Sequence, residues 1–174
     1  MDPQRINRFG LAILGICSFL FFFLWIWLHD YASLLAGFTE FFFNLRILLI
    51  FIGGILLHEG LHGFSALIFT GGKFKKIKFG FNTEMMAPYA HCAAPVKVWQ
   101  YIVMAGLPGI LMGILPTVYA LLTKEVWWYY FGFFFTWTAA GDMISIHALR
   151  KHPLKSYVLD HPDEMGFIIL HKSG

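Results

Sequence analysis

Residues 47–69 read ILLIFIGGILLHEGLHGFSALIF, and this stretch decides the fold. Apart from His58, Glu59 and His62 it is almost wholly apolar, and a helix of about 20 such residues crosses the hydrocarbon core of a bilayer. One ionisable side chain at the centre of a spanning helix costs about 3 kcal/mol on insertion scales. Three of them within little more than one turn therefore need a functional reason, and we expect a membrane helix that carries a site.

The three residues form the pattern H-E-x-x-H. Residues four apart lie on one face of a helix, so the imidazoles of His58 and His62 can bind one Zn²⁺ ion, while Glu59 beside them can act on a water molecule at the metal. In the alternative interpretation, the imidazoles only form hydrogen bonds to neighbouring helices. That alternative explains neither the spacing nor Glu59, so the leading interpretation is a zinc hydrolase site within the bilayer.

The composition agrees with an integral membrane protein. Of the 174 residues, 58% are hydrophobic and only 13% are charged, which lies outside the usual range of soluble domains. We expect a single membrane-embedded domain over residues 1–174, all-α, with about four transmembrane helices and a cytoplasmic tail at residues 150–174. The expected spans are residues 9–28, 43–69, 98–122 and 126–146.

The positions of lysine and arginine predict the orientation. They cluster before the first span, between the second and third spans, and after the fourth span, whereas the segments 29–42 and 123–125 hold one lysine. Cytoplasmic loops carry the excess of positive charge, so both termini of this multi-pass protein should be cytoplasmic. The net charge of +3 is explained by these clusters beside the lipid bilayer, which also favour anionic headgroups, and no nucleic-acid partner is expected.

Zinc held by two histidines needs a third protein ligand. Asp142 is the first candidate, because it is the only carboxylate in the expected fourth span. His62 stands eight residues before Thr70 and Asp142 eight residues before Arg150, the points where we expect their helices to reach the cytoplasm, which places both about 12 Å from the same membrane face. His147, one turn further along, is a rival ligand, and Glu84 and His91 in the preceding loop are others.

The loop between the second and third spans, residues 73–94, has a pattern of its own. Residues 76–79 alternate between charged and apolar side chains, and Asn82-Thr83 can turn the chain. We predict a short cytoplasmic β-hairpin that dips toward the site, with an irregular interfacial loop as the alternative. An exposed strand edge would let the protein bind an unwound substrate segment by strand addition.

These features carry a resemblance. The H-E-x-x-H in one membrane helix, followed by an aspartate after a glycine in a later helix, resembles the site-2 protease class of intramembrane metalloproteases. The order of features from about residue 45 onward resembles a family of small bacterial membrane proteins described as zincin peptidases. The features that carry this second resemblance, besides H-E-x-x-H, are in chain order Cys92-Ala93-Ala94-Pro95, Pro108, Gly141-Asp142, Asp160-His161-Pro162 and Gly166-Phe167.

The resemblance implies that His58, His62 and Asp142 bind zinc and that Glu59 is the general base of a peptidase. It also implies a peptide or membrane-protein substrate and a location in the bacterial cell membrane. Site-2 proteases often carry an asparagine near a proline-containing helix, whereas residues 104–109 contain none. Stabilisation of an oxyanion would then fall to zinc, to the backbone or to a loop group such as His91.

A second class of function stays open. The same ligands could serve a non-catalytic metal- or haem-binding membrane protein, such as a sensor, a transporter or an inactive relative of a protease. A transporter would need polar groups through the full depth of the bundle, and haem ligation gives no reason for Glu59. No feature of the sequence indicates an oligomeric state.

Overall fold

A computed structural model describes residues 3–83, 87–161 and 166–170 of the chain. These residues form two compact units, one of Met1–Ile52 with Pro108–Ile144 and the other of Gly53–Leu107 with Ser145–Gly174. The helices α3 (Leu45–Phe69) and α7 (Ala140–Leu149) are shared between the two units, and the last residue of α4 (Val98–Pro108) belongs to the first. Each unit is described by itself below, and the expectation of a single domain stays a prediction.

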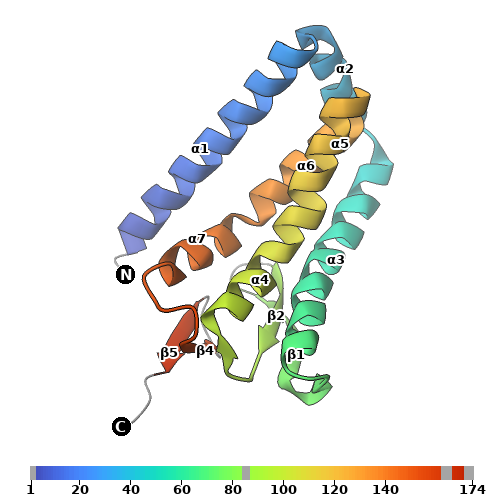
Figure 1. Ribbon diagram of the computed structural model, residues 1–174. Helices are drawn as coiled ribbons and strands as arrows, with labels where there is room; N and C mark the ends of the chain where they lie inside the picture. Colours follow the sequence, from blue (N-terminus) through green and yellow to red (C-terminus); the bar gives the residue numbers. More distant parts are fainter. Residues whose placement is uncertain (1–2, 84–86, 162–165, 171–174) are drawn as a thin grey trace. The chain divides into compact units, whose positions relative to one another are not determined.

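The first unit is helical (Figure 1), and its core is rich in aromatic side chains. Two tyrosines of α6 form hydrogen bonds to α1 and α2. The hydroxyl of Tyr129 donates to the carbonyl of Phe21 in α1 at 2.6 Å, and that of Tyr130 donates to the carbonyl of Leu34 in α2 at 2.9 Å. Both rings are almost wholly buried, so each hydroxyl needs its partner. Besides its shares of α3 and α7, the unit contains α1 (Pro3–Leu28), α2 (Tyr31–Phe42), η2 (Gly109–Ile114), α5 (Leu115–Thr123) and α6 (Val126–Thr138).

Among the residues that the structure describes, three helical stretches are long and apolar enough to cross a membrane, which is consistent with a membrane protein: Gly10–Leu28, Ile47–Phe69 and Val98–Thr123. The last of these combines α4 (Val98–Pro108), η2 and α5, with a π-helical turn directly after Pro108. Proline lacks the N–H that an α-helical bond needs, and such a turn re-routes the hydrogen bonds of the backbone.

The expected fourth span is not a single helix. Residues 126–146 are divided between α6 and α7, and the break falls at Ala139, whose backbone has φ −75° and ψ 4°. A ψ near zero departs from the α-helical value and ends the helix. The expectation of four continuous spans is therefore not confirmed.

The segment 29–42, expected to be a loop, forms α2. Asp30 is its N-cap, and its carboxylate accepts a hydrogen bond from the backbone N–H of Ser33 at 2.6 Å. Leu34, Gly37 and Phe41 are the buried residues of this helix. These residues are three and four positions apart, so a helix places them on one face, and burial of this face stabilises the helix.

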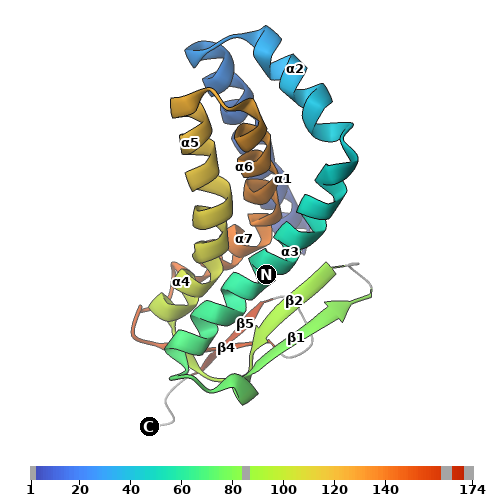
Figure 2. The ribbon, with the colours of Figure 1, turned by 90° about the vertical axis from the view of Figure 1, so that its right-hand side faces the viewer.

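The second unit combines helices with two small antiparallel sheets (Figure 2). The predicted hairpin between the second and third spans is present, with Ile77 opposite Cys92 and Asn82 opposite Ala87. The second sheet, of order β3-β4-β5, was not predicted, so the chain is mostly helical and not all-α. Besides its shares of α3 and α7, the unit contains η1 (Phe74–Lys76), β1 (Ile77–Asn82), β2 (Ala87–Cys92), β3 (Val96–Lys97), α4, β4 (Tyr157–Asp160) and β5 (Phe167–Leu170).

The tail forms part of the core of this unit. Val158 in β4 is fully buried and belongs to one apolar cluster with Cys92 in β2, Met104 in α4 and Leu149 in α7. Val158 also pairs with Val96 of β3. The segment that follows α7 is therefore integrated with the hairpin and α4.

Close packing of α5 and α6 in the first unit yields a prediction. A Cβ atom added at Gly132 would lie 2.7 Å from the carbonyl oxygen of Gly113 and 2.8 Å from the backbone nitrogen of Thr117. Because backbone atoms cannot move aside as a side chain can, Gly132→Ala should destabilise the protein by about 1–3 kcal/mol. Thermal unfolding in detergent measures this. Gly15→Ala in α1, where an added Cβ meets no atom within 4 Å, is the matched control, and equal stability of the two variants would contradict the prediction.

Candidate metal centre

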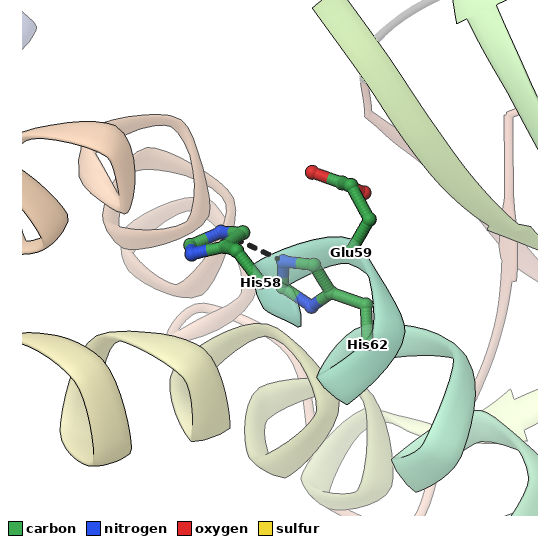
Figure 3. Close-up of side chains that lie close together, drawn as sticks. All are labelled: His58, Glu59 and His62. Carbon is green, nitrogen blue, oxygen red and sulfur yellow. Dashed lines mark hydrogen bonds between the residues drawn. The ribbon is translucent and has the colours of Figure 1, made fainter. Parts of the chain in front are cut away.

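One turn of α3 presents three potential metal ligands (Figure 3). One ligand atom from each of His58, Glu59 and His62 lies within 4.8 Å of the other two. The Nε2 atoms of the two imidazoles are 3.3 Å apart. His58 is buried, with 5% of its surface exposed, and Glu59 and His62 are half-buried. The i and i+4 positions have therefore brought the two rings together, as the sequence predicted.

The separation of the two nitrogens fits a tetrahedral zinc ion. With zinc–nitrogen bonds of about 2.05 Å and tetrahedral angles, two ligand nitrogens lie roughly 3.3 Å apart. The observed distance between His58 and His62 has this value. The donor set of two imidazoles beside a carboxylate is also one that zinc prefers. The residues present therefore fit zinc.

A backbone carbonyl fixes the tautomer of His62. Its Nδ1 lies 2.8 Å from the carbonyl oxygen of Met104 in α4. A carbonyl only accepts hydrogen bonds, so Nδ1 carries the proton and donates it. The lone pair of the neutral ring is then on Nε2, the atom that faces His58. Metal-binding histidines commonly hold their second nitrogen in this way.

Glycines beside the site make room for the hairpin. The ring of Phe79 in β1 lies against Gly63, and an added Cβ at that position would approach its Cε1 atom to 2.9 Å. Gly60, next to Glu59, also lacks a side chain. An apolar groove runs along α3 beside the H-E-x-x-H motif, lined by Gly60, Gly63, Phe64, Leu67, Phe74, Ile77 and Phe79.

The other predicted ligands are distributed as follows. Asp142 lies half-buried in the first turn of α7 and belongs to the first unit, whereas the group of His58, Glu59 and His62 belongs to the second. Its role as the third ligand stays a prediction. His147 is in the last turn of α7, in the second unit, and is not a member of the metal-binding group found among the described residues. Glu84 lies outside the described residues.

His91 is held by the tail. In the hairpin it pairs with Lys78, while Ala90 pairs with Phe79. Residues directly opposite share a face of the sheet and neighbours along a strand alternate, so His91 lies on the face opposite to the one that contacts α3 at Gly63. Its Nδ1 is 3.2 Å from a carboxylate oxygen of Asp160. Its predicted accessory role in oxyanion stabilisation stays a prediction.

Two groups near the site could not be assigned a role from the sequence. The carbonyl of Met104 belongs to the backbone, so no residue type signals its contact with His62. Asp160 was noticed only as part of the tail motif Asp160-His161-Pro162, which gives no indication that its carboxylate accepts hydrogen bonds from β2 and α4.

Comparison with known proteins agrees with this site. No curated protein and no solved structure gives a significant match. One family model matches residues 51–157, a range that contains the whole H-E-x-x-H turn, the hairpin and α4. Because this match covers more than half of the 174 residues, the chain belongs to the family described as "Putative zincin peptidase".

Proposed function

We propose that this protein is an intramembrane zinc metallopeptidase that hydrolyses peptide bonds of membrane-associated substrates. The observation that carries the proposal is the convergence of two imidazole nitrogens at 3.3 Å beside Glu59, in a helix long and apolar enough to span a membrane. Family membership supports the zinc peptidase chemistry, and the candidate spans support the membrane setting.

We assign the chemical roles in this reaction as follows. His58 and His62 hold the zinc ion, with Asp142 as the third ligand. Zinc, when bound, lowers the pKa of water toward neutrality and polarises a carbonyl group. The carboxylate of Glu59 accepts the proton of the attacking water and then delivers it to the nitrogen of the leaving amine. Glu59 is well placed for this, because one of its carboxylate oxygens lies within 4.8 Å of a ring nitrogen of each imidazole.

The membrane setting follows from the position of the motif in α3. His62 lies seven residues before the helix ends at Phe69, which corresponds to about 10 Å along the axis. The lysines that follow, Lys73, Lys75, Lys76 and Lys78, favour a cytoplasmic location for this end of the helix. We therefore place the site in the cytoplasmic half of the bilayer, with both termini on the cytoplasmic side.

Strand addition to β1 would supply the substrate in an extended form. Among the described residues, β1 pairs with β2 only. Pro88 has no N–H, and the N–H of Cys92 donates to Asp160, so neither residue donates a backbone hydrogen bond to β1. Hydrogen-bonded and non-bonded pairs alternate in an antiparallel ladder, and Phe81 and Phe79, opposite Pro88 and Ala90, therefore direct their backbone groups to the open edge.

The groove beside α3 suggests which side chain the substrate presents. Its lining is apolar, and it adjoins both β1 and the residue next to Glu59. A peptide that pairs with the edge of β1 could place one apolar side chain in this groove. We therefore expect a preference for large apolar residues close to the cleaved bond.

Zinc content tests the ligand set. Elemental analysis of the detergent-purified wild type should give about one zinc per chain, and His58→Ala and Asp142→Ala should each lose it. His147→Ala serves as the control because His147 is the rival ligand in the same helix. Retention of zinc by Asp142→Ala together with its loss from His147→Ala would reverse this assignment.

The role of Glu59 is tested separately. Glu59→Gln keeps the size of the side chain but cannot accept the proton of water, so zinc should remain while turnover falls by about a hundredfold or more. The measurement is cleavage of a detergent-solubilised reporter with one transmembrane helix. Full activity in this variant would contradict the role of a general base. A wild type that binds zinc and cleaves no such reporter would instead favour the non-catalytic, metal-binding alternative.

Strand addition makes a prediction for the backbone of β1. Phe81→Pro removes an N–H that points to the open edge, whereas Phe81→Ala removes the same ring and keeps the N–H. The proline variant should therefore cleave the reporter severalfold more slowly than the alanine variant at similar thermal stability. Equal turnover of these two folded variants would argue against strand addition.

A further inference from the structure

The carboxylate of Asp160, at the end of β4, accepts hydrogen bonds from two separate elements and contacts His91. Its Oδ2 accepts from the backbone N–H of Cys92 at 3.1 Å and lies 3.2 Å from Nδ1 of His91, both in β2. Its Oδ1 accepts from the hydroxyl of Tyr101 in α4, also at 3.1 Å. All four residues belong to the second unit. One tail carboxylate thus joins β2 and α4 to β4.

A partly buried carboxylate with such partners stays charged only if they offset its loss of hydration. Burial raises the pKa of Asp160, while the Cys92 N–H, His91 and the Tyr101 hydroxyl act in the opposite direction. Attraction to His62 also lowers the pKa of Asp160. The negative charge of Asp160 therefore interacts electrostatically with His62, one of the two imidazoles of the candidate metal centre.

The hydrogen bonds also link Asp160 to that imidazole mechanically. Tyr101 and Met104 are three residues apart in α4 and lie on neighbouring positions of one face. Tyr101 donates to Asp160, and the carbonyl of Met104 accepts the Nδ1 proton of His62. The side chain of Met104 is buried in the same apolar cluster as Val158 of β4. Both ends of this turn of α4 are therefore fixed, one by the tail and the other by His62.

We propose that Asp160 is a positioning residue of the metal centre. Through Tyr101 it holds α4 so that the carbonyl of Met104 keeps the proton of His62 on Nδ1 and its Nε2 toward the metal, and its negative charge favours a cation at the imidazoles. This inference rests on the proposed zinc function. Outer-shell partners of this kind typically change metal affinity by about 10–100-fold when they are removed.

The test is the zinc affinity of the full chain, purified in detergent and measured by competition with a chromophoric chelator. Asp160→Asn keeps the shape and removes the charge, and we expect its Kd for zinc to rise by about tenfold. Tyr101→Phe removes only the hydroxyl and should weaken zinc binding less. Asp30→Asn is the matched control, because it makes the same change at the N-cap of α2 in the other unit, and it should leave the affinity unchanged.

Two further readouts separate positioning from a merely structural role. The visible spectrum of the Co²⁺-loaded protein reports the geometry of the ligands, and it should shift in Asp160→Asn and Tyr101→Phe. Thermal unfolding of the metal-free protein reports stability. A lowered unfolding temperature with unchanged zinc affinity and an unchanged cobalt spectrum would overturn the proposal, because Asp160 would then only hold the tail in place.

The remaining outcomes are also decisive. If Asp160→Asn does not fold, Tyr101→Phe decides, and an unchanged zinc affinity in that variant overturns the inference. Absence of zinc from the wild type, even after supplementation, would overturn the proposed function and this inference together. Zinc bound equally well by the wild type and by folded Asp160→Asn would overturn the inference alone.

Discussion

The cost of placing imidazoles and a carboxylate in an apolar helix is the constraint on which this structure depends. A charged group without partners is strongly disfavoured in hydrocarbon, so His58, Glu59 and His62 need partners, and α3 provides them by its own periodicity. The 3.3 Å between the two Nε2 atoms is the separation that one tetrahedral zinc ion requires. The surrounding elements can be understood as supports for this arrangement: α4 fixes the tautomer of His62, and the hairpin covers Gly63.

Local features of this site were predictable from the sequence, because they depend on spacing within one helix. The turn that brings His58 and His62 together, the length of α3 and the hairpin at Ile77–Asn82 and Ala87–Cys92 all follow from periodicity over short distances. The same approach failed where hydropathy alone was used. Hydropathy predicted one continuous span across Ala139, because α6 and α7 are both apolar. It also predicted a loop where the chain forms α2, although Asp30 is a recognisable N-cap residue.

Contacts between distant parts of the chain could not be predicted. Asp160 is 68 residues from Cys92 and 59 from Tyr101, and only the folded chain shows that they meet. Nothing in the tail marks β4 as a partner of β3, since strands of four and two residues carry little periodic signal. The assignment of Asp142 rests on depth along a helix and on resemblance, and it is decided by zinc content and not by pattern.

The contact between Asp160 and Tyr101 has a consequence for the timing of biosynthesis. Asp160 is translated about a hundred residues after His58, an interval of roughly 5–20 s at typical rates of synthesis. During that interval α3 exists without the carboxylate that, on our proposal, completes its surroundings. On our proposal, the nascent chain would therefore bind zinc about tenfold more weakly until the tail has folded against α4.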